Sequence, residues 1–334
     1  MKKTGFIFLL FFSAGIVSAQ LPSWYVRFDQ IMDNREYFTE YAWPQTILGA
    51  RLNAGIGFQI DSVHFLTTGI NYMYEYGGTL TGVPLTLDLY YHYNGKFIQM
   101  WFGSFPRRDK LEYPNVLLND TLNYYRPNME GGLVRWNNGL GYLQAWADWT
   151  SRQTEVVKET FLAGMEGYQH RGIWIASEHI YMYHRASTVN NVTHEPIRDN
   201  GGGAVLSGFD LTTLTPLDRL VIDAGVIGSY DRVRPDPYGF AWGGMVRLRA
   251  EYGFAGMQLI WYKGDPQVLA YGDTFYSSGN YLRADFFVRL FRKYGFDAKA
   301  GLSLHLANGD LNNSQQVLIS IPFGSGRSGG SNTE

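Results

Sequence analysis

The sequence predicts an all-β protein, a transmembrane antiparallel up-and-down β-barrel of about 16 strands, within a range of roughly 14 to 18. Three observations favour this fold class. Short segments of alternating apolar and polar residues recur along the chain, and the connections between them alternate between tight and long. Aromatic residues make up 16% of the 334 residues and charged residues only 17%, which suits a protein with one surface in lipid and another in water.

The composition argues against several other classes of protein. The mean hydropathy is −0.20, and no segment after the N-terminal residues holds the run of about 20 apolar residues that a membrane-spanning helix needs. The net charge of −2 and the pI near 6.4 do not indicate a nucleic-acid partner. The absence of cysteine excludes disulfides, cysteine zinc sites and thiol nucleophiles.

The N-terminal residues have the pattern of a secretory signal. Lys2 and Lys3 precede an apolar run that begins at Phe6, and small residues end the segment at Ala19. We expect cleavage after residue 19; an uncleaved anchor is the alternative, but the apolar run is short for a bilayer. The predicted organisation is a signal peptide at 1–19, a barrel at 20–323 and a flexible Gly/Ser-rich tail at 324–334.

The strands are predicted from their period of two. The alternation is clearest at Val83–Tyr93, where Leu87 and Leu89 share one phase and Asp88 lies on the other. Asn94-Gly95 follows directly, and this dipeptide is a strong hairpin signal. In order, the expected strands are residues 24–30, 45–60, 63–76, 83–93, 96–105, 128–136, 140–151, 156–168, 172–183, 202–213, 217–230, 240–252, 256–263, 280–291, 294–306 and 314–323.

The connections between these strands provide a second indication. Tight turns are expected at residues 61–62, 94–95, 137–139, 170–171, 215–216, 253–255 and 292–293, and long connections at 31–44, 106–127, 184–201, 231–239 and 264–279. Outer-membrane barrels have short turns at the periplasmic rim and longer loops outside. The same alternation places both chain termini on the periplasmic side.

Taken together, these features resemble a Gram-negative outer-membrane porin-type β-barrel. The resemblance rests on the signal peptide, the sixteen or so alternating strands, and a final strand QVLISIPF that closes on Phe323. General porins end on the terminal aromatic residue, whereas this chain continues beyond it. The resemblance implies an outer-membrane location and a channel for passive diffusion of small hydrophilic solutes. A closed or plugged barrel that serves as a structural or docking component of an envelope assembly is the alternative.

One irregular run, residues 103–131, interrupts the series of strands. Its central part, 106–127, holds three prolines, an apolar ridge at Val116–Leu118 and a charged cluster. Because porins fold the corresponding loop inward, we expect this loop to narrow the pore, and an exposed extracellular loop is the alternative. The expected constriction residues are Arg107, Arg108, Asp109, Lys110 and Glu112.

Charged residues on the polar phase of the strands are expected to line the lumen. The basic ones are Arg51, Arg247, Arg249, Arg283, Arg289 and Lys299, and the acidic ones are Glu75, Asp88 and Asp148. Most of the basic residues belong to late strands and the acidic ones to early strands, so opposed charges would create a field across the pore and tune permeation. A local network of ion pairs between neighbouring strands would give the same pattern.

No pattern of catalytic or metal-binding residues stands out. His179 and His184, and the neighbouring His194 and Glu195, lack a spacing that fixes a metal, and neither a Gly-x-Ser-x-Gly motif nor a phosphate-binding glycine loop is present. We therefore expect no enzymatic activity, no catalytic residues, no metal and no cofactor. An outer-membrane hydrolase that uses Ser and His is the alternative, because such sites assemble from distant strands. The expected partners are outer-membrane lipid and lipopolysaccharide, small hydrophilic solutes and, as an option, further copies of the chain. Aromatic residues at strand ends are expected to form girdles at the membrane interfaces: Tyr91, Tyr93, Trp101, Trp136, Trp149, Tyr181, Tyr183, Tyr252 and Trp261.

Overall fold

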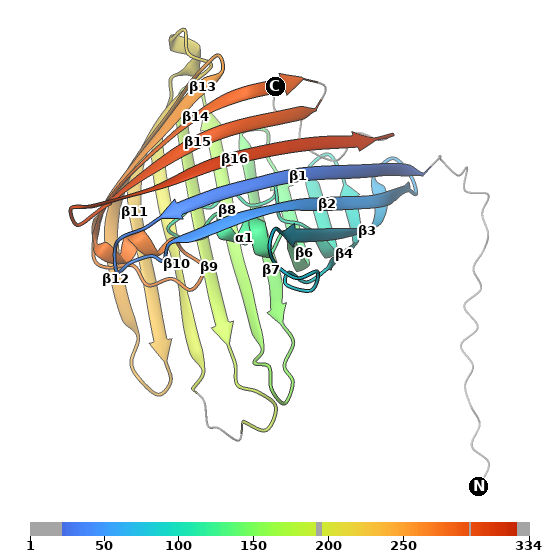
Figure 1. Ribbon diagram of the computed structural model, residues 1–334, viewed down its shortest axis with the longest axis horizontal. Helices are drawn as coiled ribbons and strands as arrows, with labels where there is room; N and C mark the ends of the chain where they lie inside the picture. Colours follow the sequence, from blue (N-terminus) through green and yellow to red (C-terminus); the bar gives the residue numbers. More distant parts are fainter. Residues whose placement is uncertain (1–21, 192–195, 294, 326–334) are drawn as a thin grey trace.

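Sixteen antiparallel strands form one closed barrel in the computed structural model, which describes residues 22–191, 196–293 and 295–325 (Figure 1). Each strand pairs with its neighbours along the chain, and β1 pairs with β16 to close the ring. The predicted fold class is confirmed, while residues 1–19 and most of the tail lie outside the described ranges. The strands are β1 (Ser23–Glu36), β2 (Gln45–Gln59), β3 (His64–Glu75), β4 (Thr86–Asn94), β5 (Ile98–Pro106), β6 (Asn128–Asn137), β7 (Gly141–Ser151), β8 (Thr160–Arg171), β9 (Trp174–Arg185), β10 (Arg198–Asp210), β11 (Arg219–Val233), β12 (Gly239–Tyr252), β13 (Ala255–Gly264), β14 (Asn280–Lys293), β15 (Phe296–Ala307) and β16 (Asp310–Gly324).

The two phases of each strand face different environments, as the alternation predicts. In β4, Leu87 and Leu89 are 57% and 56% exposed on the outer face, whereas Asp88 on the inner face is fully buried. Opposite residues of antiparallel neighbours project to the same side of the sheet, so this phase extends around the ring. The outer surface is accordingly an apolar band, and the polar phase is directed into the barrel.

The connections lie at two distinct rims. The long-loop rim carries the connections 37–44, 76–85, 107–127, 152–159, 186–197, 234–238 and 265–279, and also the tight turn 308–309. The short-turn rim carries the others. The connection 211–218 differs from the expected tight turn at 215–216, because it contains a short 3-10 helix, η1 (Thr212–Leu214). In the described ranges, no helix combines the length and the apolar character needed to cross a membrane.

Two connections of the long-loop rim lie inside the barrel and fill much of it. The first, residues 107–127, contains the helix α1 (Thr121–Tyr125), which Figure 1 shows within the ring of strands. The second, residues 265–279, contains the 3-10 helix η2 (Thr274–Ser278). Val116 and Leu117 of the first pack into a core cluster with inward side chains from β5 to β15 and with Phe275 and Tyr276 of η2.

The opposite wall packs against the same inserted loop. Tyr124 of α1 lies in a second cluster with Ile31 of β1, Ile47 of β2 and Met73 of β3. The inserted loop is therefore held between two walls of the barrel. Its apolar ridge, Val116–Leu118, is at most 8% exposed, and burying each such side chain contributes roughly 1.5–3 kcal/mol. Three of the expected girdle residues belong to the first core cluster instead. Trp101 and Tyr181 point inward and are 6% and 1% exposed, and Tyr183 packs against that cluster.

Candidate functional site

Polar side chains of β1, β2 and β3 attach the inserted loop to one wall. The Arg51 guanidinium donates from Nη1 to the backbone oxygen of Asn123 at 2.7 Å and from Nη2 to that of Tyr124. These two carbonyls lie at the end of α1, where the helix leaves its last carbonyls without internal partners. The Tyr125 hydroxyl donates to Glu75 Oε1 at 2.6 Å. The side chains of Arg51 and Glu75, two of the expected lumen residues, lie inside the barrel and bind the inserted loop.

The other wall binds the start of the same loop. Arg107 forms an ion pair with Asp148 of β7, and their side chains are 4% and 0% exposed. Burial lowers the pKa of the Lys110 ammonium, which lies 5.0 Å from the centre of the Trp101 ring. The backbone N–H of Glu112 donates to the carboxylate of Glu166 on β8. Residues of the expected constriction therefore contact the wall itself.

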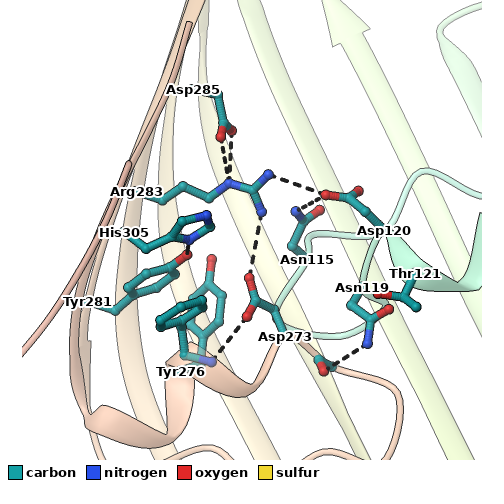
Figure 2. A network of polar contacts seen from close by, with 12 residues as sticks. Asn115, Asn119, Asp120, Thr121, Asp273, Tyr276, Tyr281, Arg283, Asp285 and His305 are labelled. Atoms are coloured by element: carbon teal, nitrogen blue, oxygen red, sulfur yellow. Dashed lines mark hydrogen bonds and ion pairs between the residues drawn. The ribbon is translucent and has the colours of Figure 1, made fainter. Parts of the chain in front are cut away.

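The two inward connections are joined through Arg283 of β14 (Figure 2). Its guanidinium lies 2.8 Å from Asp285 Oδ1 on its own strand, 3.2 Å from Asp120 Oδ2 of the inserted loop and 3.6 Å from Asp273 Oδ2 of the second connection. The backbone also connects the two segments, since Asn119 N donates to Tyr271 O at 2.8 Å. Three carboxylates from three segments thus meet one buried cation.

The remaining predicted lumen residues all point inward, and most have close partners. Asp88 accepts hydrogen bonds from Tyr25, Asn53 and Asn128 at 2.7 Å each. The late basic residues form ion pairs with neighbouring acidic residues or, for Lys299, lie over an aromatic ring: Arg247 and Arg249 with Asp223, Arg289 with Glu251, and Lys299 over Phe287. Arg108 lies 3.5 Å from Asp29, and Asp109 adopts a positive φ of 62°. This arrangement matches the alternative of local ion-pair networks.

A polar cluster on the outer face of the barrel was missed by the sequence analysis. His184, next to the end of β9, is directly opposite Asp199 of β10, and Asp199 is directly opposite Arg232 of β11. Their phase is the lipid-facing one, because Ile180 and Met182 on the same phase of β9 are 59% and 38% exposed. Together with Arg234, which follows β11, the residues His184, Asp199 and Arg232 form what we call the rim cluster, at the long-loop rim.

Asp199 organises the rim cluster. Its Oδ1 lies 2.8 Å from Nδ1 of His184, and its Oδ2 accepts from Nε of Arg234 at 2.9 Å. A carboxylate is only an acceptor, so the Nδ1 of a neutral His184 carries the proton and the lone pair is on Nε2. A histidine fixed in this tautomer by a carboxylate is arranged to act as a general base.

Aromatic side chains flank the rim cluster along the same face. Phe161 of β8 lies opposite His184, with ring centroids 5.3 Å apart, and stacks on Trp149 of β7 at 5.0 Å. On the other side the Arg232 guanidinium lies 4.8 Å from the centre of the Tyr238 ring. Aromatic rings beside cationic groups are typical of the level at which lipid headgroups meet acyl chains. A polar site there can be reached from the membrane.

Local sequence patterns contain only weak signals for the rim cluster. The spacing of His184 indicates no metal site, and its partner Asp199 is not evident from sequence because it lies on another strand beyond a long connection. His194 and Glu195 fall outside the described residues. Over 22–191, 196–293 and 295–325, no group of three or more His, Cys, Asp or Glu residues is suited to hold a metal ion.

A comparison with protein families finds a match over most of the chain. The family described as Lipid A 3'-O-deacylase-type matches residues 21–322. The chain belongs to this family. A comparison with curated proteins finds no match. Because the Lipid A 3'-O-deacylase-type family is a family of enzymes, the expectation that the protein is not an enzyme was wrong.

Solved structures with the same fold are outer-membrane barrels. A loop-deletion mutant of OmpT, an outer membrane protein of Vibrio cholerae, is 9% identical with a TM-score of 0.56, covering 90% of this chain and 99% of its own. OmpF of Salmonella typhi, in complex with daunomycin, is 9% identical with a TM-score of 0.53, covering 90% and 97%. At such identities the likeness shows the fold alone, and it confirms the porin-type barrel as the architecture of this family member.

Proposed function

We propose that the protein is an outer-membrane ester hydrolase that removes an acyl chain from lipid A, with the rim cluster as its active site. The observation that carries the proposal is the 2.8 Å contact between His184 Nδ1 and Asp199 Oδ1 on the lipid-facing side of the barrel. The family match supports the reaction class. The cluster's place among aromatic rings supports a substrate that arrives from the membrane, with the long-loop rim outside the cell.

In the proposed reaction His184 Nε2 accepts a proton from a water molecule as the water oxygen attacks the ester carbonyl carbon. The negative charge that develops on the carbonyl oxygen is stabilised by a neighbouring guanidinium, for which Arg232 and Arg234 are the candidates. Collapse of the tetrahedral intermediate breaks the bond to the sugar oxygen, which takes the proton back from His184. The products are a fatty acid and a free hydroxyl group. Asp199 keeps the imidazole in the required tautomer throughout.

The test is incubation of the full-length protein in detergent with lipid A, followed by mass spectrometry of the lipid and measurement of released fatty acid. The expected result is loss of one acyl chain, abolished or reduced by about 10²–10⁴-fold in His184→Ala. His64→Ala is the matched control, because His64 is also an outward-facing strand residue near an aspartate, Asp61, at the opposite rim. Release of fatty acid that does not depend on His184 would refute this site.

A porin-like channel for small hydrophilic solutes is a second candidate function. The inward-folded loop 107–127 favours it, since such a loop narrows rather than abolishes a wide barrel. The filled interior and the paired lumen charges favour instead a closed barrel that acts as a rigid support for the rim cluster, or as a docking component of an envelope assembly. Stepwise conductance of the purified protein in planar bilayers would support the channel, and its persistent absence would support the closed barrel.

A further inference from the structure

A cavity of about 220 Å³ lies inside the barrel between the inserted loop and the inward faces of β7 to β13. Its lining residues include Tyr142 at the start of β7, Ser177 near the start of β9 and Arg249 near the end of β12. These strand ends all belong to the short-turn rim. The cavity is therefore in the half of the barrel opposite to the rim cluster and on the inner instead of the outer face.

Two arginines in the cavity wall share a single carboxylate. Arg247 Nε lies 3.0 Å from Asp223 Oδ1, and Arg249 Nη2 lies 2.9 Å from Asp223 Oδ2. Two guanidinium groups against one carboxylate leave one uncompensated positive charge, and the three side chains are at most 22% exposed. Glu112 also lines the cavity, but it is exposed. Solvent therefore screens the charge of its carboxylate more strongly than the charges of the two arginines and Asp223.

Two buried polar atoms at the cavity have no hydrogen-bond partner within the described residues. One is Nε of Arg249 and the other is Nδ1 of His179, a residue only 4% exposed that lines the cavity. A buried donor or acceptor without a partner costs free energy, so native structures rarely leave one unsatisfied. Both residues line the cavity, so the polar groups of its wall are not all satisfied by the protein itself.

The rest of the cavity wall contains apolar and aromatic side chains and also the polar residues Asn115, Ser177 and Gln258. Ile175, Leu206, Met245 and Ile260 line it together with Tyr276. The arginine pair supplies one net positive charge, and these apolar side chains supply a hydrophobic surface. A matching ligand has one anionic end and a compact hydrophobic body. A volume of about 220 Å³ is below the range of roughly 300–1,000 Å³ typical for drug-sized ligands, so the ligand is small.

We propose that this cavity binds a small organic monocarboxylate. The carboxylate lies against Arg249 and Arg247, and the hydrophobic body lies against Ile260 and Leu206. Binding at this site is independent of the proposed hydrolase activity, because the two sites are on opposite faces and in opposite halves of the barrel. The protein would then bind the carboxylate in the short-turn half of the barrel, whereas the proposed ester hydrolysis takes place at the long-loop rim.

The test is isothermal titration calorimetry of the full-length protein in detergent, with benzoate as the probe and benzamide as its neutral counterpart. Benzoate should bind with a dissociation constant of about 1 mM or lower. Benzamide should bind at least about tenfold more weakly. Its amide is neutral, whereas the carboxylate of benzoate accepts charge-assisted hydrogen bonds from a guanidinium. Equal binding of the two compounds, or no binding of benzoate, would overturn the proposal.

Three variants locate the binding. Arg249→Gln should weaken benzoate binding at least about tenfold, whereas Arg289→Gln, which changes a lumen-facing arginine outside the cavity lining, should leave it unchanged. Glu112→Gln removes an exposed negative charge and should strengthen binding a few-fold. This increase keeps the test decisive where Arg249→Gln fails to fold, because misfolding cannot improve affinity. Benzoate affinity that is the same in wild type, Arg249→Gln and Glu112→Gln would refute the site.

Discussion

Arg107 at the start of the inserted loop and Asp148 in the middle of the β7 wall form an ion pair that is almost completely buried. The same carboxylate accepts the backbone N–H of Glu130 on the neighbouring strand at 2.9 Å. The backbone N–H of Arg107 in turn donates to the oxygen of Pro127 at 2.7 Å. Both ends of the loop are therefore fixed at one point of the wall, and the residues between them are directed into the barrel.

The first prediction concerns this ion pair. Asp148→Ala should lower the free energy of unfolding by about 3–5 kcal/mol, because it leaves the Arg107 charge buried without a partner. Denaturant unfolding followed by tryptophan fluorescence measures the change. Arg108→Ala is the control, with an expected change below about 1 kcal/mol, since its side chain is 41% exposed and exposed ion pairs contribute little. Equal effects of the two variants would contradict the role of burial.

The second prediction concerns the junction of the two inward connections. Arg283→Leu leaves Asp120, Asp273 and Asp285 close together without their shared cation, and like charges repel one another. We expect the second connection to leave the barrel interior, so that limited proteolysis cuts between residues 265 and 279. Arg219→Leu removes an exposed arginine at the short-turn rim and should leave the protease resistance unchanged. Resistance of both variants would show that the apolar contacts of Phe275 and Tyr276 suffice.

The third prediction tests whether the inserted loop blocks the barrel. Deletion of residues 109–122 removes α1 residues and the ridge Val116–Leu118, and conductance in planar bilayers should appear or increase. Deletion of 77–82 from another connection of the long-loop rim should not change the conductance. Unchanged conductance of the 109–122 deletion, in protein that still shows heat-modifiable gel migration, would mean that the loop does not restrict the pore.

The fourth prediction concerns the tautomer of His184. In Asp199→Asn the amide can donate to Nδ1, so the lone pair moves away from Nε2, and deacylation should fall by about 10²–10⁴-fold with little change in lipid binding. Release of fatty acid from lipid A measures the rate. Asp231→Asn, which changes another aspartate in an arginine ion pair close to the same rim, should keep most of the activity. A fully active Asp199→Asn protein would exclude the proposed role of this carboxylate.

The fifth prediction concerns Gly103, where the irregular run begins. Its φ is 116°, and an added Cβ would lie 2.2 Å from the backbone oxygen of Leu89 on β4. Gly103→Ala should therefore destabilise the barrel by about 1–3 kcal/mol, seen as a lower temperature of heat modification on a gel. At Gly244 the nearest atom to an added Cβ is 3.9 Å away, so Gly244→Ala should be tolerated.

Much of the fold could be predicted because a period of two is a local property of the sequence. The strand number, the inward phase of Asp88 and Asp148 and the position of the inserted loop after the fifth strand follow from it. The second inward connection could not be predicted, because its apolar run, 268–270, is not the part that is buried, and the burial of Phe275 and Tyr276 depends on packing against the first loop and the barrel wall. The pairing of Arg247 with Asp223 depends on the register between strands, which alternation leaves open.

The rim cluster could not be predicted for a related reason. His184 and Asp199 are directly opposite only because β9 and β10 pair in one register. Nothing in the local sequence marks either residue as polar on a lipid-facing phase, since both lie at strand ends where polar residues are common.

The pairing of β1 with β16 has a consequence for how the protein assembles. The seam runs over the full register from Tyr25 with Gly324 to Glu36 with Asn313, so the two ends of the chain must find each other before the ring is complete. Contacts between such distant segments form slowly. A chain that lacks β16 leaves the ring open at this seam, so proteases should reach the inserted loop. The last strand therefore also protects the two connections that lie inside the barrel.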